Sequence, residues 1–184
     1  MISDSSRMKS DSYSRESMRT HSPVLAYVVP YASIMIASIL PSLALAGTMP
    51  FLPPIGFLIF VAWRIVRPGF LPLWVGLPLG AFDDLFSGQP FGSAILLWSI
   101  TMITIEFLEA RWPWRGFWQD WVTSAIATSL YIPLALSISG TIPNMHHLLV
   151  IAPQILLSVL LYPIIARMIA RLDRLRLRRF WAIS

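Results

Sequence analysis

Two adjacent acids, Asp83 and Asp84, are the residues of this chain that most suggest chemistry. Paired carboxylates can carry out acid–base hydrolysis when they face each other across a site. Neighbours on one helix instead point about 100° apart, and the nearest other candidate, Asp120, is expected at the opposite membrane face. We therefore expect no catalytic residues, no cofactor and no enzyme activity.

The residues before and after these acids have the spacing of a packed helix and a tight turn. Gly76 and Gly80 form a GxxxG pair, which lets two helix backbones approach closely. Asp84 lies four residues beyond Gly80 on nearly the same face, which we expect to point into a bundle. One hypothesis is that Asp84 anchors loop 87–92 by accepting backbone hydrogen bonds. The alternative is a helix-end acid in contact with water. Asp83 should face the outer water or another helix.

Two further groups of polar residues are expected to have structural or solvated roles. Glu106 and Glu109 share a helix face and should form ion pairs with nearby arginines, although a proton or substrate site is an alternative. His146 and His147 have no third ligand beside them and make a poor metal site, so we expect them to be solvated. The candidate partners of the glutamates are Arg64, Arg67, Arg111 and Arg115.

Arginine and tryptophan alternate in segment 111–121, which could indicate base stacking. At the boundary of a membrane span, an aromatic belt is the better interpretation, and we expect no nucleic-acid partner. Near the C-terminus, arginines recur at helical spacing. They could bind anionic lipid, present a basic surface to a cytoplasmic partner, or only set orientation. These are Arg167, Arg171, Arg174 and Arg178.

The composition indicates which elements must position these residues. Of 184 residues, 56% are hydrophobic and only 12% are charged, against about 25% charged in soluble domains. The mean hydropathy is +0.67, and a chain of this length could not hide so much apolar surface from water. A soluble enzyme is excluded, and a bundle embedded in lipid is favoured. Cysteine is absent, which excludes disulfides and thiolate chemistry.

A helix needs about 20 apolar residues to cross the hydrocarbon core of a bilayer. The second of six candidate stretches is the weakest, because Pro53 and Pro54 interrupt its first turn. Prolines also lie in or at the ends of other stretches, so we expect kinked and closely packed helices. The stretches are 24–46, 49–63, 70–86, 91–108, 117–139 and 148–170.

The basic residues indicate the orientation of these spans. All 14 lie in the N-terminal tail, between spans two and three, between spans four and five, or at the C-terminal end. The alternate loops, 47–48, 87–90 and 140–147, contain none. With six spans, the basic segments share one side, which the positive-inside rule assigns to the cytoplasm. This predicts an all-α integral membrane protein, a bundle of six transmembrane helices with both termini cytoplasmic.

The expected organisation is a disordered cytoplasmic tail over 1–23, a membrane domain over 24–170 and a basic cytoplasmic tail over 171–184. Ala44-Leu45-Ala46 has the small residues of a signal-peptidase site. However, the apolar run before it exceeds the roughly 7–15 residues of a secretory signal, so cleavage is the secondary interpretation. An intact-mass measurement separates the two.

The motif and the topology together resemble the rod shape-determining protein MreD family. The resemblance rests on a Gly-x-x-x-Asp-Leu-x-Ser-Gly-x-Pro-x-Gly signature and covers about 24–172 in topology. Asp83 is an addition to the signature, and the Ser-rich N-terminal tail is longer than the family pattern. The signature residues are Gly80, Asp84, Leu85, Ser87, Gly88, Pro90 and Gly92.

This resemblance implies a multi-pass protein of the bacterial inner membrane and a non-enzymatic scaffold of the cell-elongation machinery, which makes peptidoglycan. It implies MreC as a partner, RodA and its partner transpeptidase through MreC, and MreB filaments inside the cell. The alternative is a substrate-binding membrane component of a vitamin or metal transporter, a class that the MreD family resembles in fold. The residues expected to form the interaction motif are Gly76, Gly80, Asp83, Asp84, Ser87, Gly88, Pro90 and Gly92.

Overall fold

The computed structural model describes residues 23–44, 52–111, 116–141 and 144–176, and every regular element within them is a helix. Residues 1–22 of the tail 1–23 that is expected to be disordered lie outside the described residues, as do the possible cleavage site after Ala46 and Arg178, while Pro23 already belongs to the first described helix. The elements are α2 (Pro23–Ala44), α3 (Ile55–Val66), the short 3-10 helix η1 (Leu73–Val75), α4 (Gly76–Phe86), α5 (Ser93–Arg111), α6 (Phe117–Ile138) and α7 (Met145–Arg176).

Three of these helices, α5, α6 and α7, are long and apolar enough to cross a membrane, as expected for a helical membrane protein. Each of the six expected spans overlaps one α-helix, and the third also includes η1, but the lengths differ from those expected. α3 has 12 residues and α4 has 11, which gives lengths of about 16–18 Å against a hydrocarbon core of about 30 Å. α7 has 32 residues and continues past the expected span end at residue 170.

Prolines set the bounds of the short helices. α3 begins at Ile55 directly after Pro53 and Pro54, because a residue that precedes proline disfavours the helical conformation. Pro68 follows the last turn of α3, and Pro72 precedes η1. The prolines inside the longer helices leave them continuous. These are Pro30 and Pro41 in α2, Pro133 in α6, and Pro153 and Pro163 in α7.

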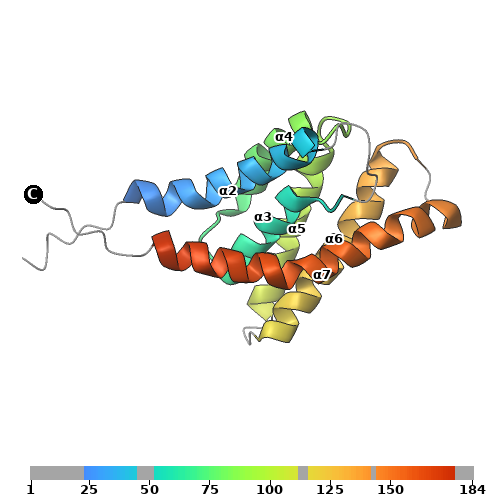
Figure 1. The fold of residues 1–184 in the computed structure, drawn as a ribbon. Helices are drawn as coiled ribbons and strands as arrows, with labels where there is room; N and C mark the ends of the chain where they lie inside the picture. The colour runs from blue at the N-terminus through green and yellow to red at the C-terminus, as the bar shows by residue number, and fades with distance from the viewer. Residues whose placement is uncertain (1–22, 45–51, 112–115, 142–143, 177–184) are drawn as a thin grey trace, which may run out of the picture.

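Helix α3 forms the centre of the bundle. All of its residues from 56 to 65 are buried, which is typical of a helix that is apolar on every side. It packs against α2, α6 and α7, and Figure 1 shows it between α2 and α7. Specific contacts fix these neighbours. The Trp63 indole donates to Ser33 Oγ of α2 at 2.9 Å, and the Phe57 ring stacks on Tyr131 of α6 with centroids 4.0 Å apart.

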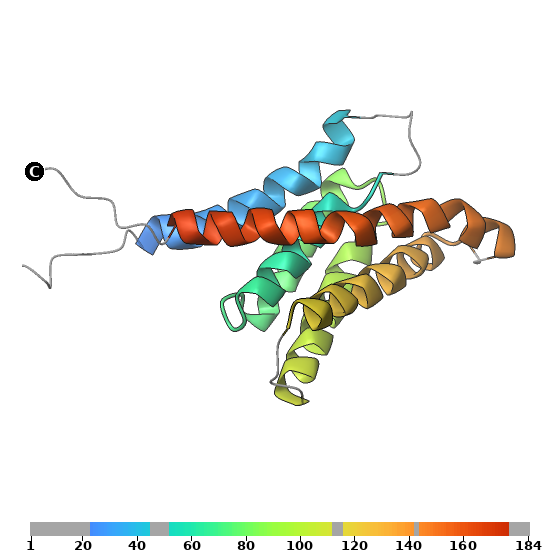
Figure 2. The same cartoon turned by 60° about the horizontal axis from the view of Figure 1, so that its bottom comes forward.

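The two ends of the bundle carry different polar residues. At one end, called the Arg64 end, ion pairs join the C-terminal parts of α3, α5 and α7. At the other, called the Asp84 end, α4 turns into α5. The start of α2 and the end of α7 lie at the same end of the molecule in both views (Figures 1 and 2). The polar candidates are therefore positioned by two separate groups of helix ends.

Candidate functional site

The GxxxG pair places α4 directly on the backbone of α5. A Cβ added to Gly80 would lie 2.7 Å from the carbonyl oxygen of Ala94 and 2.8 Å from the Cα of Ile95. At Gly76 the nearest atoms would be the backbone of Trp98 and Ser99, at 3.1 Å. The close approach expected from these glycines is confirmed, and it is tightest at Gly80.

The Asp84 carboxylate forms the N-terminal cap of α5. It accepts hydrogen bonds from the backbone amides of Gly92 and Ala94, each at 2.8 Å, and of Ile95 at 3.3 Å. The Ser93 hydroxyl donates to its Oδ1 at 3.1 Å. The first amides of a helix have no partners within the helix, and a negative charge near them is stabilising. The backbone hydrogen bonds of the anchor hypothesis are confirmed, and they extend beyond the loop into the first turn of α5.

The turn between α4 and α5 is short and depends on glycine. Gly88 and Gly92 have φ values of +69° and +103°, a region that residues with a Cβ rarely adopt. The carbonyl of Pro90 accepts from the Ser93 amide at 3.1 Å, and Ser87 Oγ lies 3.5 Å from the amide of Gln89. The signature residues of the turn thus have roles in its backbone geometry.

Asp83 faces other helices and not the outer water. Its side chain is 8% exposed and lies on the side of α4 towards α2 and α3. A Cβ on Gly56 of α3 would be 3.0 Å from Asp83 Oδ1 and 2.4 Å from Ser38 Oγ of α2. The Ser38 hydroxyl lies beside the Asp83 carboxyl. Of the two environments expected for Asp83, the structure has the interhelical one.

Two neighbouring cavities lie at the Asp84 end, and Asp83 lines the first of them. One, of about 150 Å³, is lined by polar groups of Ser38, Asp83, Ser87, Gln89 and Gln154. The other, of about 160 Å³, shares Pro54, Gln89, Tyr131 and Gln154 with the first and extends towards Ser139. Sequence analysis did not identify Ser38, Gly56 or Gln154. They are far from Asp83 in sequence, and no local pattern connects them.

The Arg64 end contains the ion pairs expected for the glutamates. Arg64 is fully buried and contacts Glu106 and, at 3.0 Å, Glu109. Burial differs between the two partners, since the Glu106 side chain is 53% exposed and that of Glu109 18%. Arg67, directly after α3, also pairs with Asp173 of α7 at 3.2 Å, an acid that sequence analysis did not single out.

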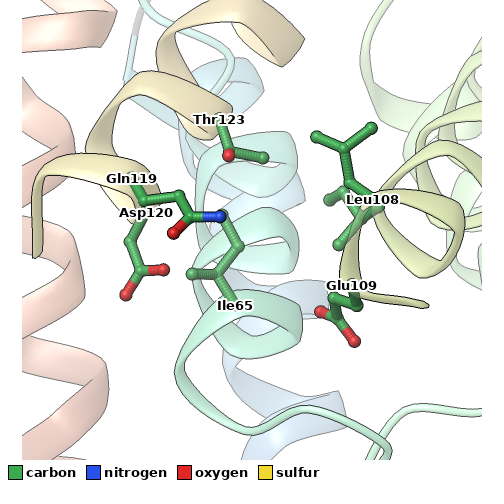
Figure 3. A pocket seen from close by; sticks show the side chains of 7 residues that line it. Ile65, Leu108, Glu109, Gln119, Asp120 and Thr123 are labelled. Carbon is green, nitrogen blue, oxygen red and sulfur yellow. The ribbon is translucent and has the colours of Figure 1, made fainter. Parts of the chain in front are cut away.

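A small hollow beside these pairs lies between α5 and α6. Figure 3 shows Glu109 and Leu108 on one side and Gln119, Asp120 and Thr123 on the other. Its volume is about 20 Å³, enough for about one water molecule. Asp120 therefore lies in a different hollow from Asp83, and the structure does not bring these two carboxylates together in one site.

Of the two histidines expected to be solvated, His146 is exposed, whereas His147 is half-buried and its Nδ1 is enclosed. His146 and His147 have ring centroids 6.2 Å apart, and in the part of the chain that the structure describes no group of three metal-ligating side chains occurs. Trp118 is 70% exposed, as expected of an aromatic belt, whereas the Trp121 indole donates to the Val159 carbonyl at 3.1 Å. Trp112, Pro113, Trp114 and Arg115 lie outside the described residues.

The arginines of α7 project from its last turns. Arg167, Arg171 and Arg174 are all exposed, and Arg174 Nε donates to the Ala170 carbonyl at 3.1 Å. Helix α7 passes through this region without a break to Arg176. The exposed arginines therefore lie on one continuous helix. Binding of anionic lipid, binding of a cytoplasmic partner and a role in orientation all fit this position.

Comparison of the chain with protein-family models, curated proteins and solved structures finds no match.

Proposed function

We propose that the chain is a non-enzymatic membrane scaffold of the MreD family, in the inner membrane of a bacterium. It crosses the membrane six times and keeps both termini in the cytoplasm. Its partners are MreC, RodA with its transpeptidase, and MreB, and its task is to hold them together so that peptidoglycan synthesis follows the filament.

The observation that carries this proposal is the use of Asp84. Its two carboxylate oxygens accept three backbone amides and the Ser93 hydroxyl. A carboxylate occupied in this way holds two helices together, and it is not free to act as a base or a nucleophile. The signature that resembles the MreD family thus builds a rigid corner, which suits a scaffold better than a reaction centre.

The two ends of the bundle support partners on both sides of the membrane. At the Arg64 end, Arg67, Arg111, Arg167, Arg171 and Arg174 leave positive charge exposed, and this charge favours a cytoplasmic partner or anionic lipid. At the Asp84 end, Leu85 and Phe91 are 68% and 70% exposed. Apolar side chains flank the rigid turn and offer a contact for an outer partner such as MreC.

Copurification with MreC from the same organism tests the proposal. The wild-type chain and the control Ile103→Ala, at an exposed position in the middle of α5, should both insert into the membrane and retain MreC in mild detergent. Asp84→Leu should insert but lose MreC and fail to restore rod shape in cells depleted of the native protein. Normal accumulation with unchanged rod shape in the Asp84→Leu strain would contradict the anchor role.

A second candidate is the substrate-binding component of a transporter, and the cavities at the Asp84 end favour it. Their lining includes one carboxylate and two side-chain amides, from Asp83, Gln89 and Gln154. A transporter component should retain a small ligand through purification. Mass spectrometry of the denatured, purified chain separates this function from a scaffold that holds only proteins.

A further inference from the structure

Asp83 differs from the other buried charged residues of the bundle. Arg64 pairs with Glu106 and Glu109, Asp173 pairs with Arg67, and Asp84 accepts backbone amides. Within the described residues no basic side chain forms an ion pair with Asp83, although it is only 8% exposed. A carboxylate buried among helices is costly unless an opposite charge or hydrogen-bond donors compensate it.

The space around Asp83 can hold such a compensating group. The cavity beside it has a volume of about 150 Å³ and adjoins a second of about 160 Å³, whereas about 10–15 Å³ of such volume holds one water molecule. Both are therefore too large for a single bare ion. Ser87 and Ser139, one in the lining of each cavity, are exposed to solvent, so a solute has access at the Asp84 end.

The lining has the chemistry of a site for an amine. Side-chain oxygens from Ser38, Gln89 and Gln154 accompany the Asp83 carboxylate, and an ammonium group requires several acceptors around one negative charge. The Tyr131 side chain belongs to both cavities, and an aromatic ring can stabilise a cation over its face. No lysine, arginine or histidine is among the lining residues of either cavity.

The absence of a side chain at Gly56 leaves room for both the Asp83 and Ser38 side chains and the cavity beside them. Any side chain on α3 at this position would collide with Ser38 Oγ at 2.4 Å and press on Asp83 Oδ1 at 3.0 Å. The glycine thus lets helices α2, α3 and α4 converge on one acid without filling the adjoining space.

We propose that the cavity beside Asp83 binds a small organic cation with an ammonium group, which pairs with Asp83 and hydrogen-bonds to Gln89 and Gln154. The proposal does not rest on the scaffold function, because the ligand would bind to the isolated chain in the absence of any protein partner. Under the scaffold function, the bound amine would make assembly depend on a solute outside the cell.

Calorimetry and thermal unfolding of the full chain in detergent test this site. The probes are ethanolamine, choline and 1,4-diaminobutane, with ethylene glycol as an uncharged analogue and sodium chloride at equal ionic strength. At least one amine should bind saturably and raise the Tm, while ethylene glycol and sodium chloride should not.

Variants assign the binding to the cavity. Asp83→Asn should weaken amine binding about tenfold to a hundredfold, the range expected for a hydrogen bond to a charged group. Gln89→Met keeps the acid but removes an acceptor, and should weaken binding about threefold to tenfold. Asp120→Asn removes the same charge at the other end and should bind as the wild type does. If Asp83→Asn does not fold, Gln89→Met and the comparison of probes on the wild type decide the result.

Three results would overturn the proposal. These are the absence of binding by all three amines, equal binding by the wild type and by Asp83→Asn or Gln89→Met, and stabilisation by sodium chloride that equals that of the amines. The last result would make the site one for an inorganic cation. Loss of MreC from the purified chain with retained amine binding would count against the scaffold function alone.

Discussion

The carboxylate of Asp84 holds the backbone amide of Ala94 at 2.8 Å, and the carbonyl of the same Ala94 lies against the bare backbone of Gly80. One residue of α5 is thus fixed from two positions of α4 that lie one helical turn apart. Asp84 accepts hydrogen bonds from the first backbone amides of α5. Gly80 lets the two helices approach closely enough for the carboxylate to reach these amides. α4 and α5 therefore form one structural unit.

Replacing Asp84 tests the cap. Asp84→Leu should lower the free energy of unfolding by roughly 1.5–3 kcal/mol, because it leaves several amides of α5 without their charged acceptor. Asp84→Asn retains one acceptor oxygen, so its free energy of unfolding should fall less than that of Asp84→Leu. Thermal unfolding in detergent measures the order, with the exposed neighbour Leu85→Ala as the control. Equal stability of Asp84→Leu and wild type would contradict the cap.

Adding a methyl group to the glycines tests the approach of α4 to α5. Gly80→Ala should destabilise by roughly 1–3 kcal/mol, as overpacking does, because its Cβ would meet the Ala94 carbonyl at 2.7 Å. Gly76→Ala, with its nearest contacts at 3.1 Å, should lower the free energy of unfolding less than Gly80→Ala does. Gly80→Leu should lower it most.

Gly116 supplies the matched control for the glycine series. A Cβ there would meet nothing within 4 Å, and its φ of −141° suits any residue. Gly116→Ala should therefore unfold at the wild-type temperature. An equal loss of Tm at Gly80, Gly76 and Gly116 would show that the glycines do not act through the α4–α5 contact.

The buried Arg64 predicts an asymmetry between its two partners. Arg64→Met should destabilise by roughly 1.5–3 kcal/mol, because it removes the charged donor to both glutamates. Glu109→Gln should lose more stability than Glu106→Gln, since the Glu109 side chain is 18% exposed and that of Glu106 is 53% exposed. Unfolding of the three variants at one ionic strength gives the comparison, and the reverse order of the glutamates would refute it.

The absence of cysteine makes the topology directly measurable. A membrane-impermeant maleimide added to intact cells should label Ser139→Cys and Ser87→Cys, whose side chains are exposed at the Asp84 end. It should label Ala110→Cys, near the Arg64 end, only after permeabilisation. Labelling of Ala110→Cys in intact cells would invert the proposed orientation.

Sequence alone predicted the local part of this structure. Asp84 and Gly80 lie four residues apart, so helical periodicity placed them on one face, and the contacts of Asp84 follow from the turn directly after it. For the ion pairs of Arg64, sequence predicts only that Glu106, Glu109 and four arginines lie on the same side of the membrane. Which arginine pairs with the glutamates depends on the position of α3 beside α5. The expected span 49–63 differs from α3 at its start, because Pro53 and Pro54 directly precede the first helical residue, Ile55.

The environment of Asp83 could not be predicted in the same way. Its neighbours Ser38 and Gly56 come from two other helices, and Gln154 from a third. Their separation in sequence follows no period, because it depends on how the helices cross. Hydropathy distinguishes a buried helix from an exposed one, but it does not show which polar groups of different helices meet at a cavity.

The central position of α3 has a consequence for how the protein is made. This helix is short, is buried on every side, and packs on α7, which is synthesised after α4, α5 and α6. Until α7 has been synthesised, the side of α3 that packs on α7 has no partner helix. The surroundings of Arg64 in the bilayer are then also incomplete. We therefore expect α3 to be held in the insertion machinery or at the membrane surface until α7 follows. A chain truncated before α7 should be degraded by membrane proteases.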